Sequence, residues 1–416
     1  MSRLAYLLLL TSAVAAAQPA PDAPSPPPDP AAAPPPVVVT PPAPVVVMPP
    51  PPETPTSAPT REQSDPNYEP WTIRPGGFIQ PQYRMRQDSP APFDEDGFRF
   101  ARARFTATGT GTAGNLVLGA YFEAELQPTF SLYDAYITVS RPLPHNGVLT
   151  VDFGQTRVPI SRQQMLSDTR LSFVDKAQIG SIAPDRDLGV RVWYVPSQLH
   201  AVRVIGGVFN GEGRNEVQNI NQSYLYAGRV EITPIGDVQP YAESAFAGNW
   251  LSLGLSAGRN VLTPGDFHET QVSLGADLSG SWKGLSGTFE YLEVRHTFSG
   301  DPAKKPGVDY KANGFTAQLA YLLPYELPPL HEARFEVSAR VEEIDRNDQV
   351  PIVSIGDPNQ SVREYTVAVS LYLRQQLWKV QLAASHFDEV ENQTATGGDA
   401  TYPNDQLLLQ ATYRVE

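Results

Sequence analysis

Two pairs of arginines could provide binding chemistry: Arg84 with Arg86, and Arg102 with Arg104. In an extended strand, residues two apart lie on the same face, so each pair would present two guanidinium groups together. Guanidinium groups bind carboxylate and phosphate oxygens, and a water-filled pathway for anions needs such cations along it. The spacing therefore predicts an anion-attracting patch if the two segments are neighbouring strands.

Acidic residues near these arginines offer a structural alternative. Glu123 and Glu125 share one face of the segment that follows the second arginine pair. Arg334 and Arg340 likewise alternate with glutamates along a later segment. Because opposite charges on neighbouring strands stabilise each other, the arginines could serve as ion-pair partners. The sequence leaves both roles open: an anion-biased or phosphate-biased pathway, or an unspecialised polar channel whose charges balance.

Composition and spacing exclude several classes of function. The chain contains no cysteine, so disulfides, thiol catalysis and cysteine metal sites are absent. The formal charge of −14 argues against a nucleic-acid partner, which needs a basic surface. We expect no enzyme activity, no cofactor and no metal, because the six histidines lack the spacing of a metal site or a catalytic triad: His145, His200, His268, His296, His331 and His386.

The first 17 residues have the features of an export signal. Arg3 gives a positive start, an apolar run covers residues 4–10, and small residues at 15–17 form a cleavage site. Residues 18–70 are rich in Pro and Ala and could not bury a core, so we expect an extended, disordered linker. Export would place the protein in a bacterium with a periplasm.

Beyond about residue 76, apolar and polar residues alternate over segments of about ten residues. In the segment 97–109, alanines and Phe105 occupy one face, whereas arginines and threonines occupy the other. No stretch reaches the roughly 18 apolar residues of a membrane helix, but about ten alternating residues can cross a bilayer as a tilted strand. Strands of soluble sandwiches are commonly shorter, near about five or six residues. Residues 71–416 are therefore predicted to form a transmembrane β-barrel with a wet lumen.

Seventeen candidate strand windows occur, although single-chain bacterial barrels have even strand numbers. Long external loops should alternate with short periplasmic turns, and this rule fails only around residues 234–248. Discarding the window at 238–248 restores the alternation. The prediction is an all-β barrel of sixteen antiparallel strands, with a long periplasmic connection at 234–248 and an aqueous channel inside.

The stretch from Val151 to Gly189 is the most specific in the chain: VDFGQTRVPISRQQMLSDTRLSFVDKAQIGSIAPDRDLG. It resembles the phosphate-selective porin O and P family, in which a Gly-Gln-x-x-x-Pro run precedes a Ser-Arg segment, a Phe-Val-acidic element and Arg-Asp-x-Gly. The matching residues are Gly154, Gln155, Pro159, Ser161, Arg162, Phe173, Val174, Asp175, Arg186, Asp187 and Gly189. Other pieces match in order, among them FRFARARFTATG at 98–109 and GGVFNGEG at 206–213.

This resemblance implies a homotrimeric, 16-stranded outer-membrane porin whose third external loop folds into the barrel and narrows it. The loop would be about residues 158–186, the longest connection, and long loops often carry function. Its cations would line the constriction: Arg162, Arg170, Lys176 and Arg186. In the family, arginines along the lumen wall attract anions, a role that four arginines match by position: Arg84, Arg86, Arg102 and Arg104.

Two local features add detail. Ser161 and Gln164 have the spacing of a capping box, which predicts a short helix near residues 162–168. Tyr413 lies on the outward face of the last segment, where it could supply the aromatic signal that barrel-assembly machinery recognises, although the chain ends in Glu416.

The predicted function is passive diffusion of small polar solutes through the bacterial outer membrane. The expected partners are outer-membrane lipid, small anions or other small polar solutes, and further copies of the chain. The alternative is a structural outer-membrane protein that tethers the envelope through its Pro-rich periplasmic arm. A barrel and an extended periplasmic arm can coexist, so one chain could combine transport with the tether role.

Overall fold

The computed structural model describes most of the chain from residue 71 onward. The described ranges are 71–87, 96–144, 147–196, 201–236, 241–243, 246, 248–262, 267–300, 308–327, 330–349, 361–390 and 405–415. The chain divides into two units, Met1–Pro50 and Pro51–Glu416, and all described residues belong to the second. The expected export signal at 1–17 and linker at 18–70 lie outside the described residues.

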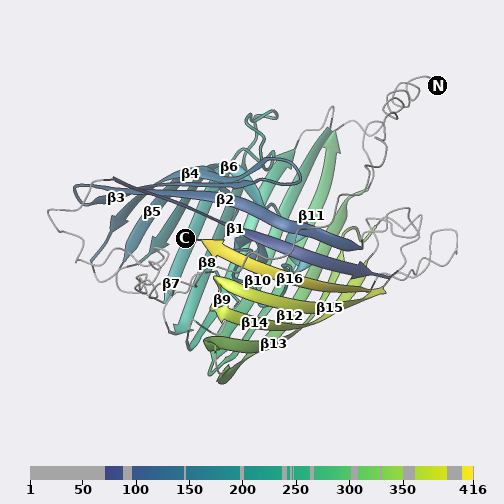
Figure 1. Ribbon diagram of the computed structural model, residues 1–416. Coiled ribbons are helices and arrows are strands. Elements are labelled where there is room, and N and C mark those ends of the chain that lie inside the picture. Colours follow the sequence, from purple (N-terminus) through teal and green to yellow (C-terminus); the bar gives the residue numbers. More distant parts are fainter. Residues whose placement is uncertain are drawn as a thin grey trace, which may run out of the picture. The chain divides into compact units, whose positions relative to one another are not determined.

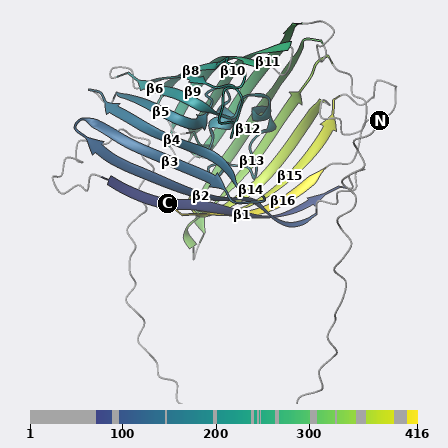
Figure 2. The ribbon, with the colours of Figure 1, turned by 90° about the horizontal axis from the view of Figure 1, so that it is seen from above.

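Sixteen antiparallel strands form one closed barrel, in which β1 pairs with both β2 and β16 (Figure 1, Figure 2). This architecture confirms the fold that the alternation predicted. The strands are β1 (Trp71–Arg86), β2 (Gly97–Ala113), β3 (Leu116–Glu125), β4 (Ser131–Pro142), β5 (Val148–Arg157), β6 (Arg186–Val195), β7 (Val202–Phe209), β8 (Leu225–Ile235), β9 (Trp250–Leu262), β10 (Phe267–Trp282), β11 (Leu285–Gly300), β12 (Tyr310–Leu327), β13 (Leu330–Asp345), β14 (Val362–Arg374), β15 (Trp378–Glu389) and β16 (Gln406–Val415).

The wall has apolar side chains outside and polar side chains inside, the reverse of a soluble protein. In β9, Leu253 and Leu255 point outward and are exposed, whereas Ser252 and Ser256 point inward and are buried. Closure of the ring pairs backbone N–H and C=O groups between strands and leaves no sheet edge. In the part of the chain that the structure describes, no helix is long and apolar enough to cross a bilayer.

The connections alternate between long and short, as predicted. At one rim, which we call the loop rim, long segments such as 158–185 and 210–224 join the strands. At the other, which we call the turn rim, two-residue turns such as 283–284 join them. Lys283 and Gly284 both have positive φ, 49° and 90°, which matches the twist of the flanking strands.

The connection between β8 and β9 is the exception at the turn rim. β8 ends at Ile235 and β9 begins at Trp250, and the described residues between them form no strand. The window at 238–248 was therefore correctly rejected, and a long connection stands in its place. Its described residues turn into the lumen, which the sequence did not predict.

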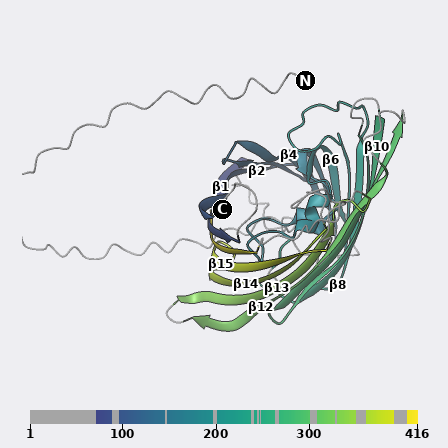
Figure 3. The ribbon, with the colours of Figure 1, turned by 90° about the vertical axis from the view of Figure 1, so that its right-hand side faces the viewer.

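The connection between β5 and β6, residues 158–185, folds back into the barrel, where Figure 3 shows its helical turns inside the wall. We call this segment the third loop. It contains a one-turn helix, α1 (Arg162–Met165), and a 3₁₀ helix, η2 (Gln178–Ile182). The inward-folded third loop implied by the resemblance is thus part of the fold.

The capping box predicted at the start of the third loop is half formed. Ser161 caps α1, because its Oγ accepts a hydrogen bond from the Gln164 N–H at 3.3 Å. The Gln164 side chain donates to Gly180 O at 2.8 Å instead of returning to Ser161. The helix ends at Met165 rather than near residue 168, because Leu166 adopts an extended conformation. A single turn has little stability alone, so tertiary contacts must hold it.

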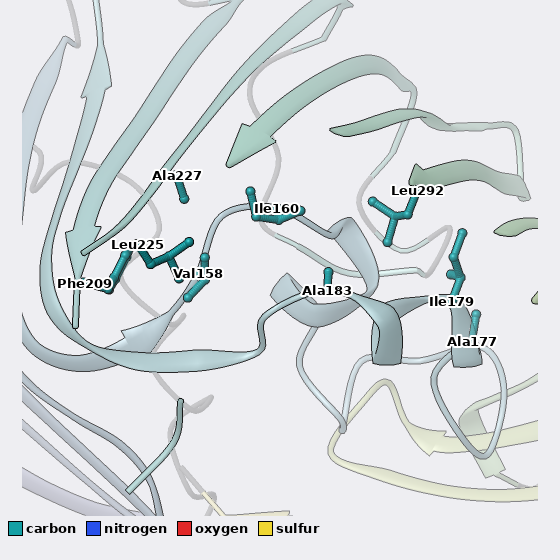
Figure 4. Packing of buried hydrophobic residues seen from close by; sticks show 9 residues of the cluster. All are labelled: Val158, Ile160, Ala177, Ile179, Ala183, Phe209, Leu225, Ala227 and Leu292. Carbon is teal, nitrogen blue, oxygen red and sulfur yellow. The ribbon is translucent and has the colours of Figure 1, made fainter. Parts of the chain in front are cut away.

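Apolar side chains fasten the third loop to one side of the wall (Figure 4). Each large side chain buried in this way stabilises the fold by roughly 1.5–3 kcal/mol. Gly258 on β9 permits the close approach, since a Cβ there would lie 2.7 Å from Ile160 Cδ1. The cluster joins loop residues Val158, Ile160, Ala177, Ile179 and Ala183 to wall residues Phe209, Leu225, Ala227 and Leu292.

The polarity of the wall leads to a first prediction. Leu255→Arg places a charge at mid-height on the outward face and should destabilise the barrel in lipid vesicles by about 2–4 kcal/mol. Thr108→Arg places the same charge on the partly exposed inner face of β2 and should cost far less. Urea unfolding in vesicles measures both. Equal losses would contradict a lipid-facing outer wall.

Candidate functional site: the constricted lumen

The third loop covers one side of the lumen and leaves the other side accessible. Most inward-facing residues of β9–β13 are buried, with Ser279 at 1% and Thr316 at 0% exposure. By contrast, the inward-facing Thr110, Thr138 and Thr150 on β2, β4 and β5 are partly exposed. A cavity of about 530 Å³, which we call the vestibule, lies along this second side.

Arginines outnumber carboxylates in the lining of the vestibule, which contains Arg157, Arg170, Arg191, Arg414, Glu123 and Asp134. Protein groups hold at least three of these arginines in place. Arg191 pairs with Asp152 at 2.8 Å, and Arg157 donates to Met165 O at 2.6 Å. Arg414 donates to Thr169 Oγ1 at 3.2 Å. Their charges are therefore fixed along the accessible side rather than on flexible chains.

Arg104, one of the predicted anion-path residues, lies in a dense set of ion pairs. Its guanidinium is 2.7 Å from Glu123, 2.8 Å from Glu125 and 2.6 Å from Asp168 of the third loop. The ring of Tyr133 lies against it, 3.7 Å from centroid to Cζ. Arg104 is buried. These contacts favour the structural role that the sequence left open for this residue.

Asp168 joins the cations of the wall to those of the third loop. Its carboxylate is also 3.6 Å from Arg102 Nε and 3.6 Å from Lys176 Nζ. Burial alone would raise the pKa of Asp168, but Lys176, Arg104 and Arg102 hold that pKa well below its usual range. Burial lowers the pKa of Lys176 to about 7, although Asp168 favours its charged form. Lys176 is therefore partly charged at neutral pH.

The two predicted arginine pairs share the inner face but do not form one patch. Gln80 lies opposite Arg102, whereas Arg84 lies opposite Gly97, closer to the loop rim. Arg86 continues in the same direction, and its backbone N–H donates to Asp96 Oδ1 at 2.6 Å. Arg102 turns towards the third loop, where it donates to Asp175 Oδ1 at 3.0 Å. The register of β1 on β2, which the sequence could not supply, separates the pairs.

The predicted loop cations also divide between two environments. Arg170 lines the vestibule. Lys176 lies in the middle of the lumen, where it pairs with Asp168. Arg162 is buried between the rings of Tyr241 and Trp250, at 5.5 Å and 5.7 Å. Arg186 is buried as well, in an ion pair with Asp134 at 3.1 Å and a second with Asp185 at 2.9 Å.

Three further cations, Arg99, Arg191 and Arg414, face the lumen and were not predicted as site residues, and strict alternation accounts for all of them except Arg99. Arg99 shares the parity of the outward alanines of β2, yet it donates to the inward-facing Gln82 at 2.7 Å. A bulge at Ala101 shifts the register between Gln80 and Pro81 and rotates Arg99 inward. The signal in the sequence is a charge at a position that would otherwise face lipid. Arg191 and Arg414 follow the alternation and could have been selected from it.

The fold is shared with porins of known structure. No protein-family model matches the chain, and no curated protein sequence matches it. The in-vitro folded outer membrane protein OmpT of Vibrio cholerae matches over 83% of this chain and 98% of that chain, with a TM-score of 0.54 and 10% identity. An anion-selective porin from Comamonas acidovorans matches over 83% and 99%, with a TM-score of 0.54 and 13% identity. OprB of Pseudomonas putida matches over 83% and 94%, with a TM-score of 0.53 and 10% identity. At these identities the likeness establishes the porin fold alone.

The ion pairs of Arg104 give a second prediction. Arg104→Met leaves three buried carboxylates without their shared cation and should lower the free energy of unfolding by about 3–5 kcal/mol. Urea unfolding in lipid vesicles measures the loss. Arg99→Met is the matched control. Arg99 is exposed and the substitution removes one hydrogen bond to Gln82, so the free energy of unfolding should change much less. If Arg104→Met is as stable as the wild-type protein, the structural role of Arg104 is rejected and only the anion-binding role is left.

Lys176 gives a third prediction, which concerns pH. As the pH rises from about 6 to about 8, Lys176 loses its proton and the constriction becomes less positive. The chloride-to-potassium permeability ratio should therefore fall across this range. Lys176→Arg, whose guanidinium stays charged, should remove the fall. Lys176→Met should show the high-pH ratio throughout. A fall that persists in both variants would assign the titration to another group.

Proposed function

We propose that the protein is a porin-like channel of the bacterial outer membrane that passes small polar solutes by passive diffusion. The observation that carries this proposal is the combination of an apolar outer wall with an accessible, charged vestibule beside the third loop. A closed barrel with such a wall is suited to lipid, and a polar interior is suited to water and solutes.

The lengths of the connections at the two rims support an orientation in the membrane. Because long connections in outer-membrane barrels face outward and short turns face the periplasm, we propose that the loop rim faces the outside. This orientation agrees with an export signal at 1–17 and a periplasmic Pro-rich segment at 18–70. Tyr413 points outward at the turn rim, in edge contact with Trp378 at 4.8 Å, as an assembly signal would require. We further propose a homotrimer, since one structure of the same fold is described as a trimer form of OmpT.

We infer a weak anion preference from the vestibule. Four arginines line the vestibule against two carboxylates, and although Asp152 balances Arg191, the remaining cations still outnumber Glu123 and Asp134, so the local potential favours anions. Arg102 and Arg104 add less, because Asp168 and the glutamates of β3 balance them. Selectivity for phosphate depends on the resemblance of residues 151–189 to the phosphate-selective porins, and it remains the narrower version of this proposal.

Planar-bilayer recording tests the proposal. In a salt gradient, the reversal potential should indicate a modest preference for chloride over potassium. The double variant Arg170→Gln with Arg414→Gln removes two vestibule cations and should lower the chloride-to-potassium permeability ratio about two-fold or more. Arg295→Gln is the matched control, because Arg295 lies on the outward face and pairs with Glu293 at 2.5 Å.

Each outcome separates one part of the proposal from the rest. Absence of conductance from folded protein would reject the channel. A reversal potential that favours potassium would reject the anion preference while retaining the channel. Chloride current that phosphate does not block would reject the phosphate-specific version alone.

A further inference from the structure

The connection between β8 and β9 enters the lumen from the turn rim and contacts three parts of the wall. The Tyr241 hydroxyl donates to Glu231 Oε1 of β8 at 2.6 Å. The Tyr241 ring lies 6.4 Å from the ring of Trp193 on β6. Further along, the ring of Phe246 makes an edge contact with Tyr372 of β14 at 5.0 Å. Residues 241–243 and 246 therefore cross the lumen beneath the third loop.

Glu243 joins this connection to the third loop through its backbone and its side chain. Its backbone N–H donates to Arg170 O at 3.0 Å. The Ser172 N–H donates to Glu243 Oε2 at 3.1 Å, and the Ser172 hydroxyl donates to Glu243 O at 2.8 Å. These three hydrogen bonds fix Arg170 and Ser172, which lie two positions apart in the third loop, to Glu243.

The second carboxylate oxygen of Glu243 connects the loop to the wall. Oε1 accepts from Gln163 Nε2 of α1 at 3.1 Å and from Gln318 Nε2 of β12 at 2.6 Å. Glu243 O also accepts a longer hydrogen bond from Ser286 Oγ of β11 at 3.4 Å. Glu243 is buried, and a buried carboxylate is stable only with such donors around it. The Glu243 side chain thus bridges two parts of the third loop to β12, and the Glu243 backbone carbonyl adds the contact with β11.

Space on the two sides of this connection differs greatly. The cavity bordered by Glu243, Thr288 and Gln318 has a volume of only about 10 Å³, room for at most one water molecule. The vestibule on the other side, which Tyr241 borders, has a volume of about 530 Å³. The connection therefore separates a filled half of the lumen from an accessible half.

We propose that residues Tyr241–Glu243 form a strut that locks the third loop against the β11–β12 wall and confines solutes to the vestibule. Glu243 acts as a positioning residue, because it binds both the third loop and the wall, and it adds to the direct hydrogen bonds that Glu290 of β11 accepts from Ser161 and from the Gln163 N–H. The strut contributes to the constriction from the periplasmic side, while the third loop enters from the outside. The assignment of the solute path rests on the proposed channel function, whereas the closure of the β11–β12 side does not.

Cysteine labelling tests the closure directly, because the chain contains no native cysteine. Thr288→Cys places a thiol on the buried inner face of β11, and Thr110→Cys places one on the vestibule side near the same rim. The probe is a sulfonated methanethiosulfonate, and mass spectrometry of protein in vesicles measures the reaction. The second thiol should react rapidly and the first should be protected. Equal rates would overturn the closed half.

Removal of Glu243 should then open the protected side. In the Glu243→Ala background, Thr288→Cys should react roughly tenfold faster or more, because local opening becomes commoner. Glu243→Gln keeps the size of the side chain but turns one acceptor into a donor, so it should give an intermediate rate. Glu293→Ala, which removes an outward-facing glutamate, is the matched control and should leave the thiol protected.

Conductance gives an independent measure of the strut. Glu243→Ala should raise the single-channel conductance by roughly 1.5- to 2-fold, as solute gains access to the second half. Heat-modifiable mobility on gels shows whether each variant is folded. If Glu243→Ala does not fold, the same measurements are made on Glu243→Gln. Protection and conductance that stay at wild-type values in a folded variant would overturn the role of Glu243. A wild-type protein without conductance would reject the channel function. The labelling experiment would still show whether the strut closes the β11–β12 side.

Discussion

The closed ladder of backbone hydrogen bonds is the constraint on which the rest of the protein depends. In a medium without water, backbone N–H and C=O groups must be paired internally, and a ring of sixteen strands achieves this without an edge. The same ring determines polarity, because adjacent residues such as Leu255 and Ser256 must face opposite environments. A ring of this size encloses more space than wall side chains fill. The third loop and the strut occupy that space on the β9–β13 side.

Filling one side of the lumen dictates how its charges are arranged. A buried charge is stable only when it is paired, and the filled side contains such sets. Arg229 pairs with Glu231 at 2.9 Å and with Asp277 at 2.7 Å, and Arg340 lies 3.4 Å from Glu342. On the accessible side, water can solvate an excess of arginine. A selectivity for anions can therefore arise only along the vestibule, where the field of the cations reaches solvent.

Local patterns in the sequence predicted the features of the fold that depend on residues close together in the chain. Alternation and connection length gave the sixteen strands and rejected the window at 238–248, because side-chain direction and turn length act within about ten residues. The pairing of Arg104 with Glu123 was foreseen as an alternative, since the two strands are neighbours. The contact of Arg104 with Asp168 was not, and neither was the strut at Glu243. Arg104 and Asp168 lie 64 positions apart, and Glu243 and Gln318 lie 75 positions apart, so these contacts depend on the path of the loops through the lumen.

The third loop is held by three kinds of contact, and their difference implies a fixed aperture rather than a gate. Near β7, β8 and β11 the contacts are apolar, and near β2 they are buried ion pairs of Asp168. At β12 they are hydrogen bonds through Glu243, which binds Ser172 of the loop and Gln318 of the wall. Salt weakens exposed ion pairs but has little effect on buried ones. Loss of one set, such as the Glu243 contacts, therefore loosens the loop locally at that part of the wall and leaves the other two sets in place. Movement of the whole loop would have to break all three sets together, and this favours a constriction of constant size.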